Sequence, residues 1–214
     1  MRSTKVLDML EDGKIEELKA ALRDEIYQES LKKKPNAKKR YSAMKKYFTY
    51  ADSVREICQK PNPIEYEGTQ YTAFCNAYTL ALTTESVGEM ELFAGPGNYP
   101  DVTRLIKIEG EEKKLNISKV LAEAKSQGYK LKKYEFFSNR CLMHYDGSYF
   151  RIALLDSTFA IIDDGEEPIV YHVSDSKKPL IIKTSVGIAL IMPINRNEPN
   201  PDVDDSKIII EVDA

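Results

Sequence analysis

Two histidines are the first candidates for chemistry in this sequence, because imidazole is the side chain most often used as a general base and as a metal ligand. His144 and His172 each fall in a segment that we expect to be a β-strand. Neither has a second ligand or a nucleophile at a spacing typical of a catalytic or metal site. We therefore expect packing or surface roles for both histidines.

Four acidic residues surround Gly165, namely Asp163, Asp164, Glu166 and Glu167. Carboxylates can bind a metal ion, but this group stands between an expected helix and an expected strand, where solvated acidic turns are usual. The sequence also has no Gly-x-Ser-x-Gly, no His-Glu-x-x-His and no phosphate-binding glycine loop. We predict no catalytic residue, no metal site and no cofactor, and hence a protein that is not an enzyme.

The cysteines and the apolar runs indicate the cellular compartment. Cys58, Cys75 and Cys141 are odd in number and far apart, which indicates neither a disulfide framework nor a zinc site. No run reaches the roughly 18 apolar residues of a membrane helix, and the N-terminus is too acidic for a signal peptide. We expect a cytoplasmic protein without membrane contact.

A basic segment stands out in a chain whose net charge is -3. Residues 32–46 carry eight basic side chains and no acidic one. Two interpretations remain open, a solvated helix surface or a patch that contacts DNA phosphates, since such contacts depend on the local potential. The candidate DNA-binding residues are Lys32, Lys33, Lys34, Lys38, Lys39, Arg40, Lys45 and Lys46.

The elements that would position these residues follow from apolar spacing. Residues before about 60 are predicted to form two or three helices, interrupted at Gly13 and again at Pro35. A second apolar stripe begins at Tyr41 and ends before Pro61. The first helical stripe, at spacings of three and four, consists of Ile15, Leu18, Leu22 and Ile26.

From residue 62 onward the pattern changes to strands. Two strands are expected to meet near Asn76, and residues 89–93 form a short strand-like segment. A helix with Asn116 or Ser118 as its N-cap ends at Gly128, and Asp146-Gly147 is typical of a tight hairpin. A second helix and three further strands follow. This order predicts an α+β fold whose helices cover one face of a largely antiparallel sheet.

The segment GNYPDVTRLI, residues 97–106, resembles the stretch that joins the second and third domains of the bacterial DNA polymerase III beta subunit, the sliding clamp. Further correspondences follow in clamp order: CNAYTLALTTE keeps the Leu-Ala that follows a turn, and GIALIMPI resembles the terminal clamp strand with its Met-Pro finish. The matching connector positions are Gly97, Tyr99, Pro100, Asp101, Arg104 and Leu105.

The resemblance implies a reduced clamp-like chain of about one and a half domains, with helices packed on antiparallel sheets. Residues 1–40 are predicted to be a helical N-terminal segment, residues 41–96 a partial clamp-like domain and residues 97–106 the connector. Residues 107–196 resemble the third clamp domain. Residues 197–214 form a tail that we expect to fold back, either as an added strand or as an occupant of a peptide cleft.

That cleft is the site that the resemblance implies. Sliding clamps bind partner peptides in an apolar cleft between the second and third domains, and ordinary core packing is the alternative role for the matching residues. A pocket of this kind suits an extended peptide with apolar and acidic groups. The matching positions are Leu80, Pro100, Arg104, Leu105, Pro179, Leu190, Ile191, Met192, Pro193 and Ile194.

Two functions remain open at this stage. The first is a clamp-like accessory of DNA replication, of a kind that a mobile element could encode, which binds duplex DNA without sequence preference and a polymerase or repair protein through the cleft. A ring would then need several copies of the chain. The second is a protein-interaction module that keeps the clamp fold without encircling or binding DNA, and that either binds host replication proteins or oligomerises through its N-terminal helices.

Overall fold

The computed structural model describes residues 3–32, 34, 36–50, 58–93, 101–131, 140–175, 177–194 and 208–213. Over these residues the fold is α+β, with helices against antiparallel sheet, as predicted. Lys33, Pro100 and the Gly97–Tyr99 part of the connector lie outside the described residues. Among the described helices, none is long and apolar enough to cross a membrane.

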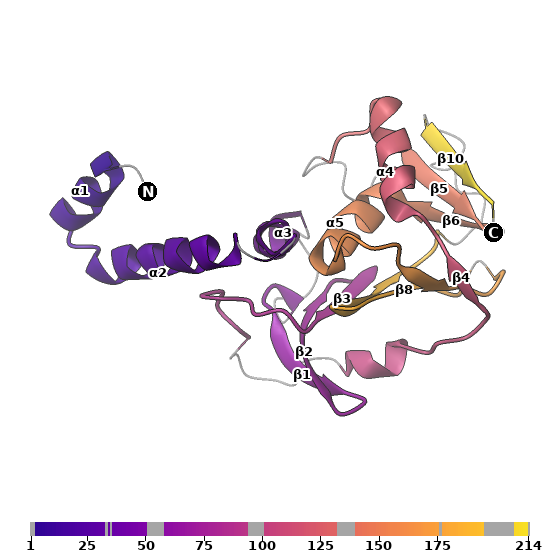
Figure 1. The fold of residues 1–214 in the computed structure, drawn as a ribbon, viewed down its shortest axis with the longest axis horizontal. Helices are drawn as coiled ribbons and strands as arrows, with labels where there is room; N and C mark the ends of the chain where they lie inside the picture. Colours follow the sequence, from indigo (N-terminus) through magenta and orange to yellow (C-terminus); the bar gives the residue numbers. More distant parts are fainter. Residues whose placement is uncertain are drawn as a thin grey trace.

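Three helices form the N-terminal segment: α1 (Ser3–Glu11), α2 (Ile15–Leu31) and α3 (Ala37–Tyr50). The break between α1 and α2 lies at Gly13, whose positive φ of 69° suits glycine. Figure 1 shows α1 and α2 extending away from the rest of the chain, whereas α3 lies against it. We call α1 and α2 together the N-terminal arm.

Seven strands form the main sheet, in the order β1-β2-β3-β9-β8-β7-β4, and all of its neighbours are antiparallel. The pairing of β3 with β9 joins residues from the two predicted clamp-like domains into one continuous sheet. The strands are β1 (Asn62–Tyr66), β2 (Thr69–Cys75), β3 (Thr79–Thr83), β4 (Glu112–Lys114), β7 (Ile169–Tyr171), β8 (Leu180–Thr184) and β9 (Gly187–Ile191).

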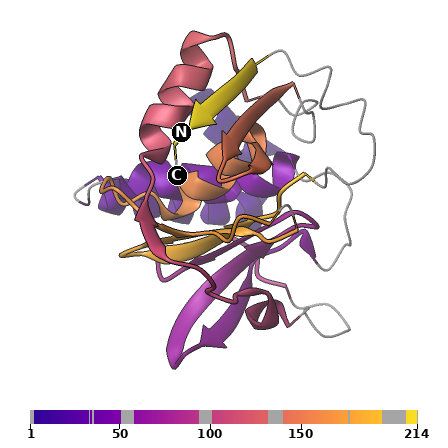
Figure 2. The ribbon, with the colours of Figure 1, turned by 90° about the vertical axis from the view of Figure 1, so that its right-hand side faces the viewer.

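Helix α5 (Ile152–Ile162) is the centre of the core, since nearly all of its side chains are buried. It packs on β3 and β9 with one side and on α3 with another, so that α3 joins the helical layer above the sheet (Figure 2). Gly187 permits the close approach, because a Cβ at this position would collide with the Leu82 carbonyl and the Ile162 side chain. Helix α4 (Ile117–Ser126) begins as predicted, where the Asn116 side chain accepts a hydrogen bond from the Lys119 amide at 2.8 Å.

A smaller sheet contains β10 (Ile208–Val212), β5 (Cys141–Tyr145) and β6 (Ser148–Arg151), in that order. The predicted Asp146-Gly147 turn joins β5 to β6, and both residues have positive φ. Strand β10 runs parallel to β5, with Ile210 opposite Met143. Of the two expectations for the tail, the added strand is the one that residues 208–212 adopt.

One local prediction was wrong. Residues 89–93 form no strand; instead the Phe93 amide donates to the Pro61 carbonyl in irregular backbone. The apolar stripe of α2 lies on a helix, as predicted, but Leu18 is its only buried member, and Ile15, Leu22 and Ile26 are exposed. The stripe predicted a helix correctly but did not reveal that this helix would project from the body.

Candidate functional site

A cleft of about 410 Å³ opens on the face of the main sheet opposite α5, beside strands β3 and β9. Four segments that are distant in sequence form its walls: the end of β2 with the β2–β3 turn, the 3-10 helix η2 (Val102–Leu105), the residue before β8, and β9. We call it the β3–β9 cleft. It is lined by Cys75, Asn76, Ala77, Tyr78, Thr79, Leu80, Arg104, Leu105, Lys107, Pro179, Leu190 and Met192.

The alternation of β9 decides which of its side chains reach the cleft. Successive side chains of a strand point to opposite faces of the sheet. Leu190 lies opposite Leu80 across the β3–β9 pair, and both belong to the apolar cluster beneath the cleft. Ile191 points the other way into the α5 core, and Ile194 packs beside β5 and β6 with Leu142 and Tyr149.

The 3-10 helix η2 is anchored by its buried Val102 and presents Arg104 and Leu105 to the cleft. Val102 is 1% exposed and packs in the cluster beneath the cleft, whereas Leu105 is 53% exposed. The Arg104 guanidinium pairs with the Asp101 carboxylate, with 2.7 Å between Nε and Oδ2. Arg104 and Leu105 thus form an exposed apolar and cationic rim that a ligand can contact without unfolding the helix.

The turn between β2 and β3 is held rigid by its own polar groups. The Asn76 side-chain oxygen accepts hydrogen bonds from the Tyr78 and Thr79 amides, each at 2.8 Å. Below the turn, the buried Tyr47 hydroxyl lies 2.7 Å from the Thr79 hydroxyl and connects α3 to this wall. The guanidinium of Arg151 stacks over the Tyr78 ring at 5.5 Å. This wall is therefore preformed and presents an aromatic ring.

The chemistry of the lining favours binding over reaction. Burial, together with the neighbouring Cys58, raises the pKa of the Cys75 thiol to about 12, so that the thiol is protonated at neutral pH. The remaining described lining is mainly apolar, with Arg104 and Lys107 as its cations. Such a surface fits an extended peptide with apolar side chains and a carboxylate.

The structure brings together six of the ten residues that the clamp resemblance implied: Leu80, Arg104, Leu105, Pro179, Leu190 and Met192. Ile191, Pro193 and Ile194 are buried and do not line the cleft, and Pro100 lies outside the described residues. The turn residues 76–79 and Lys107 were not predicted to line it. The turn residues could have been predicted, because the turn that precedes Leu80 matches the clamps by position.

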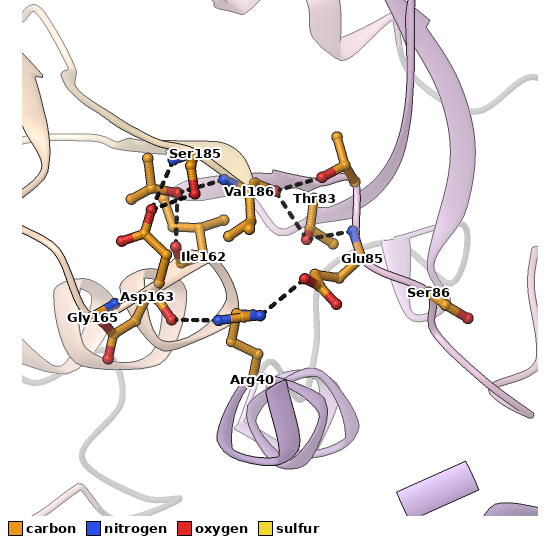
Figure 3. A network of polar contacts seen from close by, with 12 residues as sticks. Arg40, Thr83, Glu85, Ser86, Ile162, Asp163, Gly165, Ser185 and Val186 are labelled. Atoms are coloured by element: carbon orange, nitrogen blue, oxygen red, sulfur yellow. Dashed lines mark hydrogen bonds and ion pairs between the residues drawn. The ribbon is translucent and has the colours of Figure 1, made fainter. Parts of the chain in front are cut away.

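The predicted DNA-binding residues lie in two different environments. Arg40 is 4% exposed: its guanidinium donates to the Asp163 carbonyl at 3.0 Å and to the Glu85 carboxylate at 2.9 Å (Figure 3). It therefore joins α3 to the end of α5 and to the segment after β3. Its neighbours on the outer face of α3 are exposed, namely Lys38, Lys39, Lys45 and Lys46.

Several of the exposed lysines already have carboxylate partners. Lys39 pairs with Asp163 and Lys45 with Asp24, each at 2.7 Å, and Lys32 pairs with Glu29 at 2.5 Å. Two shallow cavities of about 290 and 230 Å³ lie along the outer side of α5, between α3 and α4, and both contain Lys39 in their lining. The helical layer thus carries cations on the side away from the main sheet.

Both histidines hold strands together. His144 Nδ1 lies 2.6 Å from the Glu211 carboxylate of β10 and the imidazole stacks on Tyr149, while the buried His172 lies 3.2 Å from Asp146. Within the described ranges, no three His, Cys, Asp or Glu side chains converge as they would around a metal ion. These contacts agree with the packing roles that the sequence predicted.

No family model matches the sequence, and no curated protein matches it. Among solved structures, the chain is similar to a crystal structure from Eubacterium rectale described as a "Putative DNA polymerase III beta subunit". The two are 14% identical with a TM-score of 0.48, and the alignment covers 77% of this chain and 65% of the other. The chain thus spans just under two thirds of that structure, and similarity at this level says nothing about function.

Proposed function

We propose that this protein is a non-enzymatic, clamp-like accessory of DNA replication, which binds an extended peptide of a partner protein in the β3–β9 cleft and contacts DNA without sequence preference. The cleft is the observation that supports the proposal. Six residues chosen from the clamp resemblance, in segments separated by up to about a hundred positions, line one apolar cavity. Core packing alone would not leave such a cavity open to solvent with a cationic rim.

The DNA part of the proposal rests on the helical layer. Because α3 packs on α5, its basic outer face belongs to the same layer as α4 and α5. Lys125 on α4 lies near this face as well, 3.8 Å from Asp156 of α5. Phosphates interact with such a surface through local charge, and the interaction is expected to weaken as salt rises.

One observation favours the alternative, a protein-interaction module that does not bind DNA. Among the described basic candidates, at least four are engaged by carboxylates of the same chain: Lys32, Lys39, Arg40 and Lys45. Each ion pair reduces the positive potential that a phosphate would meet. In this alternative the cleft keeps its peptide-binding role, and only the helical face loses its ligand.

Peptide binding tests what both functions share. A fluorescent peptide with two leucines and an aspartate, of the class that sliding clamps bind, is titrated with the protein in anisotropy measurements. We expect Arg104→Ala and Leu105→Ala each to weaken binding by about tenfold, the effect of losing a contact worth roughly 1.4 kcal/mol. The matched control is Leu92→Ala, an exposed leucine outside the cleft lining. Equal affinity of all four proteins would overturn the assignment of the cleft.

Duplex binding separates the two functions. The double variant Lys38→Ala/Lys46→Ala is compared with Lys60→Ala/Lys178→Ala, which removes the same charge from two lysines elsewhere whose side chains are each 43% exposed. For a DNA-binding protein we expect the first variant alone to weaken binding and to reduce the salt slope by about one to two. If the wild type does not bind duplex DNA at low salt, the alternative function stands.

A further inference from the structure

The N-terminal arm exposes an unusual share of apolar surface. Ten large apolar side chains are exposed among the described residues, and five of them lie on α1 and α2. Ile26 is the most exposed of all, at 70%. Exposed apolar side chains concentrated in one segment are typical of an interaction site. The five side chains are Leu7, Leu10, Ile15, Leu22 and Ile26.

Three of these residues form a ridge along α2. Ile15, Leu22 and Ile26 are separated by seven and four positions, which places them on one face of a helix. Asp24 and Tyr27, on the opposite face, hold α2 to α3: Asp24 accepts from the Tyr41 hydroxyl at 2.5 Å, and the Tyr27 ring meets that of Tyr41 edge-on at 5.0 Å. The ridge is therefore directed away from α3.

The charges along the arm differ between its two ends. Where α2 begins, the acidic Glu11, Asp12, Glu16 and Glu17 outnumber the basic Lys14 and Lys19. Past its other end, Lys32, Lys34 and Lys38 outnumber Glu25 and Glu29 of its last two turns, so the first end keeps a negative charge and the second a positive one. The local pairs Lys19–Glu16 and Lys32–Glu29 are exposed and three residues apart, so they neutralise these ends only weakly. A partner that covers the ridge must present basic groups at one end and acidic groups at the other.

We propose that the partner is a second copy of this chain, whose α2 lies antiparallel on the ridge about a two-fold axis that passes between Leu22 and Ile26. Antiparallel pairing lays the acidic end of each α2 beside the basic end of the other and opposes their helix dipoles, whereas parallel pairing would bring like charges together. Leu22 of one copy then packs on Ile26 of the other. Such a contact is isologous and closes as a dimer.

The arm is large enough for this role. Helix α2 has 17 residues, a length of about 25 Å. Only the face of the arm with the exposed apolar side chains is available to a partner, so the contact belongs to the small class of interfaces that form weak dimers. Burial of the ridge would also give the exposed apolar side chains the contacts that they lack within the chain. This inference concerns the arm alone and does not depend on the function of the β3–β9 cleft.

Sedimentation of the full chain from low to high micromolar concentration tests the proposal. We expect a monomer–dimer equilibrium that Ile26→Glu weakens by at least about tenfold. Ile108→Glu is the matched control, because Ile108 is an exposed isoleucine outside the arm, and it should leave the equilibrium unchanged. Circular dichroism verifies that both variants keep their helices. The proposal is overturned if the wild type stays monomeric at all concentrations, or if the Ile26→Glu variant dimerises as strongly as the wild type.

Charge reversal tests the antiparallel arrangement. Glu16→Lys/Glu17→Lys makes both ends of α2 basic, and Lys32→Glu/Lys34→Glu makes both ends acidic. We expect each variant to dimerise poorly alone and their mixture to form a heterodimer, because basic ends then meet acidic ends. Self-association of each variant that equals that of the wild type would overturn the antiparallel arrangement.

Discussion

The two ends of the described chain attach to the same body in opposite ways. The N-terminal arm buries Leu18 and Leu31 but leaves most of its α2 stripe in solvent. Strand β10, near the C-terminus, pairs with β5 over five residues and buries Ile210 to 1% exposure. Both segments are amphipathic in sequence, and only one of them became part of the core.

Backbone hydrogen bonding explains this difference. A helix satisfies its peptide groups internally, so the arm can project from the body and still keep its structure. A single strand satisfies none of its peptide groups and must pair with another strand. The exposed edge of β5 offers such a partner, and the Glu211 carboxylate of β10 adds a contact to His144 across the pair. A helical appendage therefore remains available to other molecules, whereas a strand is bound by its own fold.

The largest predicted effect lies in α3, the helix that connects the N-terminal arm to the rest of the chain. We expect Arg40→Ala to lower the free energy of unfolding by about 3 to 5 kcal/mol, because the substitution leaves the partly buried Glu85 carboxylate without its cation and removes the bond to the Asp163 carbonyl. Lys38→Ala, on the exposed face of the same helix, should change it by less than about 0.5 kcal/mol. Urea denaturation measures both, and equal effects would show that Arg40 does not anchor α3.

The docked strand should be the next most sensitive feature. Ile210→Ala is expected to cost about 2 to 4 kcal/mol, since it opens a cavity where β10 meets the core. The neighbouring Ile209 is 38% exposed on the other face of the strand, and Ile209→Ala should cost clearly less. Thermal unfolding of the pair measures the difference; similar losses would mean that β10 is held by its backbone alone.

The arm should respond locally. Leu18→Ala truncates a buried side chain in the half of α2 that lies next to α1, and is expected to speed amide exchange in α1 by roughly tenfold or more, without changing the unfolding of the body. Arg23→Ala, an exposed substitution on the same helix, serves as the control. A drop in the melting temperature of the sheet after Leu18→Ala would indicate that arm and body unfold together.

The smallest effect concerns pH. Partial burial raises the pKa of Asp24, but hydrogen bonds from Lys45, Tyr41 and Gln28 outweigh this effect and hold the pKa below its ordinary 3.8. The stabilising contribution of Asp24 is thus fully present above about pH 4 and is lost as pH falls through the lowered value. We expect amide exchange in α2 of the wild type to accelerate as the pH falls below about 4. The Asp24→Asn variant should show no such acceleration.

Much of the fold and part of the site could be predicted from the sequence because they depend on local chemistry. Asn116 caps α4, Gly128 ends it, and Asp146-Gly147 forms the hairpin turn, each through side chains or φ values that act within a few residues. The cleft residue Leu105 was predicted by its place in a clamp-like motif. The division of the neighbouring positions 190 and 191 between cleft and core was not predicted, because it depends on which face of β9 the helix α5 covers.

The sequence by itself determined the helices, most strands and turns, and the α+β class, since apolar periodicity and turn residues act locally. Only the tertiary structure decided that Arg40 would be buried while Lys38 and Lys39 remain exposed, although all three belong to one basic run. It also decided that Ile210 would enter the core and Ile26 would not. The physical reason is the same in each case: burial depends on which surface a side chain meets, and that surface comes from residues far away in the chain.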